Sequence, residues 1–173
     1  MHKVACTAVA VLLGACSPAG SPEAPLAGAG VVTHPVDGDT VDIDLGGTEE
    51  RVRLIGIDTP ESVARDRPVE CFGPEAKARL AELLPPGTPV RLERDVEARD
   101  RFGRLLAYVF RSADDAHVNL LLVEEGFAEA RPFEPNITRQ AELDLAEDRA
   151  RAAGRGLWPA CGGTDVPVGP PPG

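Results

Sequence analysis

The sequence predicts a small closed β-barrel that carries about three α-helices. Five short segments with the residue alternation or β-branched content of strands lie between residues 31 and 110, and turn signals separate them. Apolar residues at helical spacing occur once between the third and fourth strands and twice after the fifth. A plain α+β sandwich would share this order of elements and is the alternative fold.

The expected strands cover residues 31–36, 40–45, 50–57, 90–96 and 105–110. The turn Asp37-Gly38-Asp39 joins the first two into a hairpin, and Gly46-Gly47 leads the chain into the third. Pro35 indicates an edge or a bulge, because proline cannot donate a hydrogen bond to a neighbouring strand. We therefore expect the first three strands to form an antiparallel meander with aspartate-rich turns at the strand ends, and all five strands to be antiparallel.

The expected helices cover residues 74–84, 117–125 and 137–153. The first ends at Pro85-Pro86-Gly87, the second at Gly126, and the third begins after Asn136 as its N-cap. One helix after the third strand and further helices after the fifth suit a five-stranded barrel of the oligonucleotide-binding (OB) type.

The two ends of the chain are expected to lie outside this domain. Residues 1–15 have a basic start and an apolar run of about ten residues, as in a signal peptide. The run ends in Leu13-Gly14-Ala15-Cys16, which resembles a bacterial lipobox with Cys16 lipidated, and cleavage without lipid is the alternative. The expected units are then a lipidated N-terminus and tether at 16–30, the domain at 31–161 and a disordered Pro/Gly tail at 162–173. The protein is predicted to be exported and held at the cell envelope.

Two cysteines, Cys71 and Cys161, remain in the expected domain. An even pair in an exported protein favours a disulfide, and closing this loop would stabilise the fold by about 4–5 kcal/mol in the chain-entropy model. Two buried free thiols are the alternative. Two distant cysteines and three scattered histidines cannot form a metal cluster.

The charge balance is acidic, with a formal net charge of −10. This argues against broad electrostatic binding of nucleic acid but leaves room for a small basic site. Sixteen of the eighteen basic residues are arginines, which favour two-pronged contacts with phosphate.

The residues 51–61 (RVRLIGIDTPE) carry the most informative chemistry. Arg53 lies within the third strand, and Asp58 and Glu61 follow at its end, so that a guanidinium and two acids suit a phosphate and a hard cation. By simple alternation Arg53 and Asp58 face opposite sides of the strand. The chain must therefore twist or bend near Gly56 if both side chains are to reach one phosphate.

Several motifs follow one another along the domain: Asp37-Gly38-Asp39-Thr40, 52–61 (VRLIGIDTPE), 72–76 (FGPEA), 100–109 (DRFGRLLAYV), Val118-Asn119 and Gly156-Leu157-Trp158. In this order they resemble the staphylococcal nuclease (thermonuclease) family from about residue 31 to 161. One motif alone would be weak, whereas together they are specific.

The resemblance implies a metal site and a set of residues around it. Asp39 and Asp58 match the carboxylate ligands of one Ca²⁺, with the Thr59 carbonyl as a third ligand. The residues expected around the metal or in contact with the substrate are Asp37, Thr40, Arg101, Phe102 and Phe133.

The resemblance also implies catalytic roles. Arg53 and Arg104 match two arginines that bind the phosphate oxygens and stabilise a five-coordinate transition state. Glu61 matches the residue that activates the attacking water. The implied activity is Ca²⁺-dependent endonuclease cleavage of DNA and RNA, single strands favoured, by a monomer, with 3′-phosphate and 5′-hydroxyl products.

The sequence departs from the family at the substrate pocket. Phe102 replaces a tyrosine that contacts phosphate. Residues 131–135 (RPFEP), where the family has the tyrosines that line its nucleotide pocket, are one residue shorter and contain no tyrosine, although Phe133 could stack on a base. We expect weaker substrate binding, or an altered substrate preference, with the chemistry retained. The alternatives are a non-catalytic nuclease-like module that binds protein or oligonucleotide at the envelope, and a structural lipoprotein with a Ca²⁺-stabilised barrel.

Overall fold

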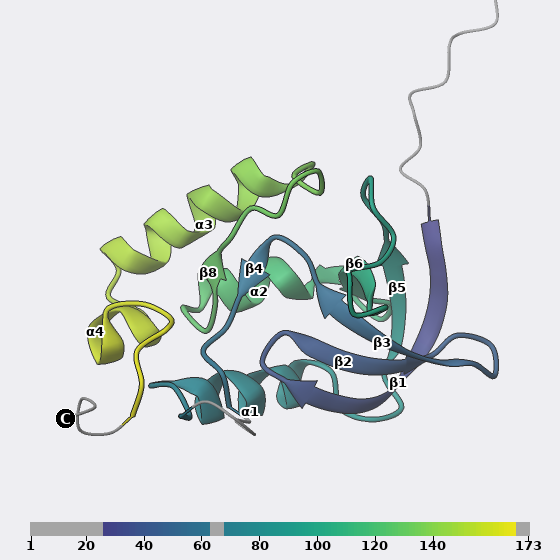
Figure 1. Cartoon of the computed structure of the whole chain (residues 1–173), viewed down its shortest axis with the longest axis horizontal. Coiled ribbons are helices and arrows are strands. Elements are labelled where there is room, and N and C mark those ends of the chain that lie inside the picture. The colour runs from purple at the N-terminus through teal and green to yellow at the C-terminus, as the bar shows by residue number, and fades with distance from the viewer. Residues whose placement is uncertain (1–25, 63–67, 169–173) are drawn as a thin grey trace, which may run out of the picture.

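The computed structural model describes residues 26–62 and 68–168, which form a closed five-stranded mixed β-barrel and four helices (Figure 1). The barrel strands are β1 (Leu26–Asp37), β2 (Thr40–Asp44), β3 (Glu49–Leu54), β5 (Pro89–Glu93) and β6 (Leu105–Arg111). Three two-residue strands are β4 (Ile57–Asp58), β7 (Ala116–His117) and β8 (Glu129–Ala130). The helices are α1 (Gly73–Leu83), α2 (Val118–Glu124), α3 (Gln140–Ala152) and α4 (Leu157–Cys161). The predicted fold class is confirmed, with the short α4 as an additional helix.

The barrel closes through a parallel pair. Neighbouring strands in the order β3-β2-β1-β5-β6 are antiparallel, and β3 then pairs with β6 in parallel, with Val52 opposite Leu105 and Leu54 opposite Ala107. The expectation of antiparallel strands therefore fails at this one seam. The reason is geometric, because an odd number of strands in a closed ring cannot alternate direction at every pairing.

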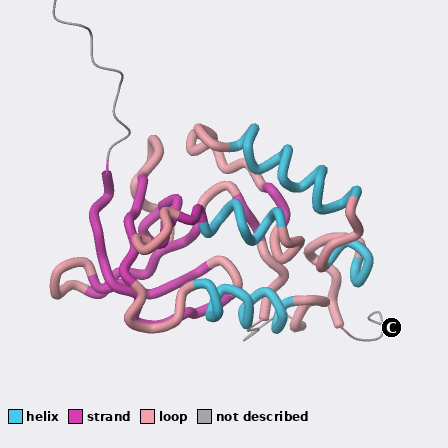
Figure 2. Tube along the Cα trace, turned by 180° about the vertical axis from the view of Figure 1, so that it is seen from behind, coloured by secondary structure: helices cyan, strands magenta, loops and turns pink. Residues whose placement is uncertain are grey.

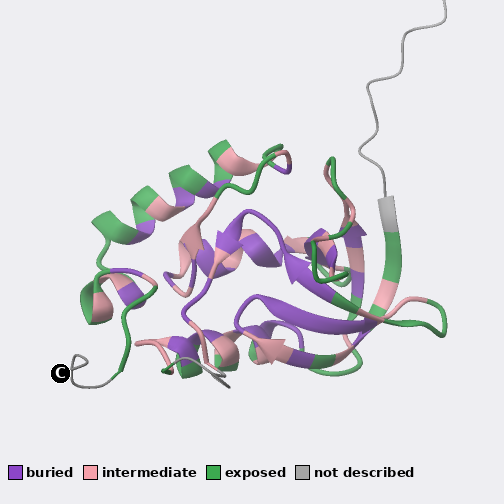
Figure 3. Cartoon of the chain, viewed as in Figure 1, coloured by how far each residue is buried: buried purple, intermediate pink, exposed green. Residues whose placement is uncertain are grey.

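The core lies inside the barrel and extends beneath the helices. Val41, Ile43, Val52 and Leu54 alternate inward from β2 and β3 and are fully buried. Helices α2, α3 and α4 gather on one side of the barrel (Figure 2), and α3 turns one face inward while its outer face is exposed (Figure 3). The buried Asn119 of α2 ties the two parts together, since its side chain accepts from the Val109 N–H and donates to the Ile55 carbonyl.

Strand β1 begins five residues before the expected start of the domain at Val31. Gly28, Ala29 and Gly30 pair with Leu92, Arg91 and Val90 of β5. The sequence predicts a tether here because residues 17–30 are mostly Pro, Gly, Ala and Ser without periodicity. Backbone pairing with a neighbouring strand needs no β-forming side chains, so the free edge of β5 recruits these residues.

The C-terminal tail also differs from the prediction of disorder from residue 162. The Cys71 N–H donates to the Val166 carbonyl, and the Val168 N–H donates to the Val69 carbonyl. The predicted disulfide between Cys71 and Cys161 is present, with the Cα atoms 6.0 Å apart. It anchors the start of this segment beside its pairing partner.

Asn136 does not cap α3, which begins at Gln140. Its side chain instead accepts from the Glu97 N–H at 2.8 Å and donates to the Glu97 carbonyl at 3.2 Å. Asn136 is buried, and its side-chain amide matches the backbone N–H and carbonyl of one residue, so this pairing satisfies the polar atoms of the buried side chain.

The bend required near Gly56 is present. Strand β3 ends at Leu54, Gly56 has φ +78°, and the chain resumes as β4 in a second small sheet with β8. A left-handed φ is accessible to glycine without steric cost. Arg53 and Asp58 therefore belong to different sheets, and simple alternation does not apply between them.

The expected signal peptide, the lipidated Cys16 and most of the tether lie outside the described residues. Among residues 26–62 and 68–168, no helix has the length and apolar character needed to cross a bilayer.

His117 is an ionisable residue within the core. It is 8% exposed, and its ring stacks on Phe110 with the ring centroids 4.6 Å apart. Neither ring nitrogen has a hydrogen-bond partner in the described part of the chain. Burial lowers the pKa of His117 to about 3, and the positive charges of Arg139 and Arg91 act in the same direction.

A His117→Met variant is expected to be less sensitive to acid than the wild type. Below the unfolded pKa of 6.5 the unfolded chain binds a proton that the folded chain does not, so stability falls as the pH decreases from 6.5 toward 3. From pH 7 to pH 5 this costs the wild type about 2 kcal/mol. Urea unfolding of both proteins at both pH values measures the difference, and equal losses in the two proteins would contradict this role.

Candidate active site

A cleft of about 790 Å³ lies between the β1–β2 turn, strand β3, strand β4 and helix α1. It is lined by every residue predicted to hold the metal or act in catalysis, together with two of their expected neighbours: Asp37, Asp39, Thr40, Arg53, Asp58, Thr59, Glu61 and Arg104. These residues come from four separate parts of the sequence. The fold therefore gathers them at one place.

Arg53 lines this cleft and is 8% exposed. Its Nη2 atom lies 2.8 Å from Asp39 Oδ2 and 2.9 Å from Asp58 Oδ1. Its Nη1 atom donates to the carbonyls of Leu54 and Ile57 on the two sides of the Gly56 bend. The guanidinium thus holds both carboxylates and the bend in one arrangement.

The β1–β2 turn aims two aspartates at the cleft. Asp39 Oδ1 accepts from the Thr40 hydroxyl at 2.9 Å, and its Oδ2 accepts from the Thr59 N–H at 3.4 Å. Asp37 accepts from the Gly38 N–H at 2.9 Å and from the Ser62 hydroxyl. A Cβ at residue 38 would lie 2.6 Å from Thr59 Oγ1, so this close approach requires glycine.

Asp58 is held from two sides. Arg53 contacts its Oδ1, and the Nε of Arg131 lies 3.2 Å from its Oδ2. Burial raises the pKa of Asp58 to about 6, against the lowering effect of Arg53, and the nearby charge of Asp39 raises it further. Burial therefore favours the neutral form of the Asp58 side chain, and the positive charges of Arg53 and Arg131 favour its ionised form.

Glu61 and Arg104 approach the cleft from two loops. The Glu61 N–H donates to Glu70 Oε2 at 2.9 Å, which fixes the backbone that carries the expected base. The Nε of Arg104 lies 2.6 Å from Asp100 Oδ2, and this half-buried pair sits in the turn before β6. Although burial raises the pKa of Asp100, the hydrogen bond from Arg104 holds it below its usual value.

The expected substrate contacts lie beside the cleft. Arg101, Phe102 and Phe133 line an adjoining cavity of about 470 Å³, which shares Arg53 and Arg104 with the cleft. Phe102 is 68% exposed, and the guanidinium of Arg101 lies 4.7 Å from its ring centroid. Exposed aromatic rings flanked by arginines are suited to stacking on bases.

Sequence reasoning missed three residues of the site. Arg131 binds Asp58 across the β4–β8 pairing, Lys77 lines the cleft from α1, and Glu70 holds the Glu61 backbone. No local pattern marks Arg131, because 73 positions separate it from Asp58. The helical pattern places Lys77 directly after the buried Ala76, and this gives no sign that Lys77 lines a site.

The donor atoms suit a hard cation. Asp39 Oδ2 and Asp58 Oδ1 both contact the same Arg53 nitrogen, so two carboxylates converge on one positive charge. In the described ranges no group of three or more His, Cys, Asp or Glu side chains is arranged to hold a metal ion. Two carboxylates completed by carbonyl and water oxygens are compatible with Ca²⁺, which binds through oxygen.

The small mixed barrel gathers arginines and acids in one cleft, and these are the residue types that suit phosphate groups and hard cations. The family model described as staphylococcal nuclease homologue matches residues 51–160. A thermonuclease of Staphylococcus intermedius is 38% identical over 128 residues, which cover 74% of this chain and 74% of the relative. A thermonuclease of Staphylococcus hyicus is 36% identical over 73% of each chain. The endonuclease YncB of Bacillus subtilis is 35% identical over 73% of this chain and 60% of the relative.

The chain belongs to the staphylococcal nuclease family. The match confirms the family to which the sequence motifs pointed, and the motifs at Arg53, Asp58, Glu61 and Arg104 fall within the matched residues.

Proposed function

We propose that this protein is a nuclease that hydrolyses phosphodiester bonds of DNA and RNA with Ca²⁺ bound, favouring single strands and acting as a monomer. The observation that carries the proposal is the gathering of Arg53, Arg104, Asp39, Asp58 and Glu61 in one cleft. Membership of the family supports it, as do relatives named thermonuclease and endonuclease. A non-catalytic binding module would not need all five of these side chains together.

The two arginines are proposed to bind the phosphate that is cleaved. Both arginines line the cleft, the buried Arg53 from β3 and the partly exposed Arg104 from the turn before β6, so that their guanidinium groups can contact different non-bridging oxygens. Attack on phosphorus adds negative charge to these oxygens. Donors already fixed in place stabilise that charge without reorganisation.

Glu61 is proposed to accept the proton of the attacking water. Its carboxylate lines the same cleft as both arginines, and its backbone is fixed by Glu70. Asp39, Asp58 and the Thr59 carbonyl would hold Ca²⁺, whose charge would stabilise the dianionic five-coordinate transition state and polarise nearby water. Departure of the 5′ oxygen would leave a 3′-phosphate and a 5′-hydroxyl.

The products of a defined oligonucleotide test the proposed chemistry. We expect digestion of a 5′-labelled single-stranded DNA in Ca²⁺ to give fragments that end in a 3′-phosphate. Treatment with a 3′-phosphatase should then slow their migration in a gel. Fragments with 3′-hydroxyl ends would contradict the proposed direction of cleavage while leaving a nuclease in place.

We also propose that the chain is exported and anchored by lipid on Cys16, on the strength of its N-terminal sequence. A Cys16→Ser variant is expected to move from the membrane fraction to the soluble fraction of cells that export it. Equal membrane association of the variant and the wild type would contradict the anchor.

A further inference from the structure

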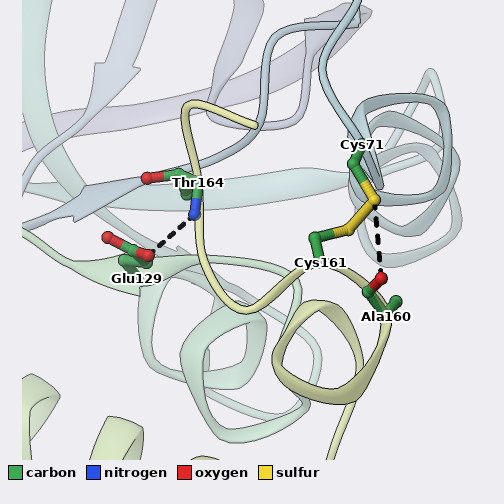
Figure 4. Close-up of a disulfide and its surroundings, with 5 residues drawn as sticks. All are labelled: Cys71, Glu129, Ala160, Cys161 and Thr164. Atoms are coloured by element: carbon green, nitrogen blue, oxygen red, sulfur yellow. Dashed lines mark hydrogen bonds between the residues drawn. A yellow bond between two sulfur atoms is a disulfide. The ribbon is translucent and has the colours of Figure 1, made fainter. Parts of the chain in front are cut away.

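The segment that follows α4, residues 161–168, lies against two parts of the chain that carry site residues. We call it the C-terminal segment. Cys161 at its start is bonded to Cys71, and Figure 4 shows Thr164 farther along it, donating from its backbone N–H to Glu129 of β8. Beyond Thr164, backbone hydrogen bonds join Val166 to Cys71 and Val168 to Val69.

The first contact leads to Glu61. The Glu61 N–H donates to Glu70 Oε2 at 2.9 Å, and the Glu70 N–H donates to the Glu61 carbonyl, also at 2.9 Å. One residue therefore holds the backbone of the expected base through both its N–H and its carbonyl. Glu70 lies between Val69 and Cys71, the two residues that the C-terminal segment binds, and it forms a bridge with Pro167.

The second contact leads to Asp58. Thr164 donates to Glu129 at 2.7 Å, which places the segment beside β8. The Nη2 atom of Arg131 then lies 3.2 Å from the Thr164 hydroxyl and 3.3 Å from Asp165 Oδ2. The same guanidinium reaches Asp58 Oδ2 through its Nε. The segment thus orients Arg131, and Arg131 orients the carboxylate.

We propose that the disulfide-anchored C-terminal segment positions two of the carboxylates of the site, Glu61 through Glu70 and Asp58 through Arg131. Glu70 and Arg131 are positioning residues in this proposal, because each contacts a site residue while neither lines the cleft. The inference rests on the proposed function for the roles of Glu61 and Asp58. Its structural content, that the segment fixes the backbone of residues 61 and 70, is independent of that function.

Two truncations test the proposal. A chain that ends at Gly162 keeps the disulfide and loses the contacts of residues 163–168, whereas a chain that ends at Val168 loses only residues beyond the described part. We expect the first to cleave single-stranded DNA about tenfold more slowly at saturating Ca²⁺, because small displacements of reacting groups cost large factors in rate. The second should cleave at the wild-type rate.

Amide hydrogen exchange of the same proteins gives a readout that does not depend on cleavage. In the chain that ends at Gly162, exchange at Glu61 and Glu70 is expected to be at least tenfold faster, while the core strands keep their protection. If wild-type exchange persists at both amides, the proposal is overturned. If exchange accelerates but no protein, wild type included, cleaves DNA, the positioning stands and the proposed function fails.

Replacement of Glu70 separates positioning from general stability. Glu70→Gln keeps an oxygen that can accept from the Glu61 N–H, and Glu70→Ala does not. We expect Glu70→Ala to lower kcat about tenfold with an unchanged KM and melting temperature, and Glu70→Gln to restore most of the rate. Equal rates for the two variants and the wild type would contradict the role of Glu70.

Discussion

Replacing Arg53 by methionine is expected to abolish measurable cleavage and to destabilise the metal-free protein by about 3 kcal/mol or more. The change removes the cation that pairs with the carboxylates of Asp39 and Asp58 and the donors to two carbonyls at the Gly56 bend. Two partly buried acids would then face each other, and Asp58 would keep only the partly exposed Arg131 as a counter-charge. The rate should fall by a factor of at least about 100, since one fixed donor to the transition state is lost.

The Ca²⁺ affinity of the same variant distinguishes this account from simple unfolding, because the affinity is expected to rise. The guanidinium nitrogen that contacts both carboxylates competes with a metal for them. Arg53→Met should therefore bind Ca²⁺ more tightly than the wild type, and saturating Ca²⁺ should restore much of its melting temperature. Arg53→Lys is the matched control, because it keeps the charge without the two-pronged geometry. Wild-type cleavage by Arg53→Met, or weaker Ca²⁺ binding in the folded variant, would contradict this account of the site.

Replacing Arg104 by alanine is expected to lower kcat by a factor of about 100 to 1,000 while leaving the fold in place. Arg104 lies in the turn before β6, and its partner Asp100 remains bound to the N–H groups of residues 102 and 104. The turn should therefore keep its shape. The loss of a half-exposed ion pair is expected to cost no more than about 1 kcal/mol.

Arg91→Ala provides a comparison for Arg104→Ala. Arg91 also forms a surface ion pair, with Asp115, but it lines neither the cleft nor the adjoining cavity. Single-turnover cleavage at saturating Ca²⁺, with denaturant unfolding of each protein, measures both effects. Similar rates for Arg104→Ala and Arg91→Ala would remove Arg104 from the catalytic site.

The barrel could be predicted because its signals are local. The alternation of residues in β2 spans only a few positions and predicts a strand. The turn residues Asp37-Gly38-Asp39 are equally local and predict where a strand ends. The parallel closure between β3 and β6 has no local signal. It follows from the number of strands that must fit in one ring.

The early start of β1 and the ordered C-terminal segment were missed for a related reason. Both stretches are rich in glycine, proline and alanine, which by composition are typical of linkers. Both nevertheless pair through their backbones with a neighbour, β5 in one case and residues 69–71 in the other. The composition of a segment does not show whether a strand or loop far away in the sequence will pair with its backbone.

The site was predictable where its residues cluster in motifs. Asp39, Arg53, Asp58, Glu61 and Arg104 were named from the sequence, and the required bend at Gly56 was deduced from the face on which each side chain would lie. Arg131 and Glu70 could not be named. Each acts on a site residue through tertiary contacts that form only when β4 pairs with β8 or when the segment after α4 folds back.

Cleavage of single-stranded DNA by the purified protein, in Ca²⁺ and in excess chelator, tests the central claim most directly. Glu61→Ser would be measured beside the wild type, with circular dichroism to confirm that both are folded. The account predicts cleavage in Ca²⁺, none in chelator, and a rate at least about 100-fold lower for Glu61→Ser, as expected for loss of a general base. A folded wild type that binds Ca²⁺ but cuts nothing, or cleavage indifferent to both chelator and Glu61→Ser, would contradict it.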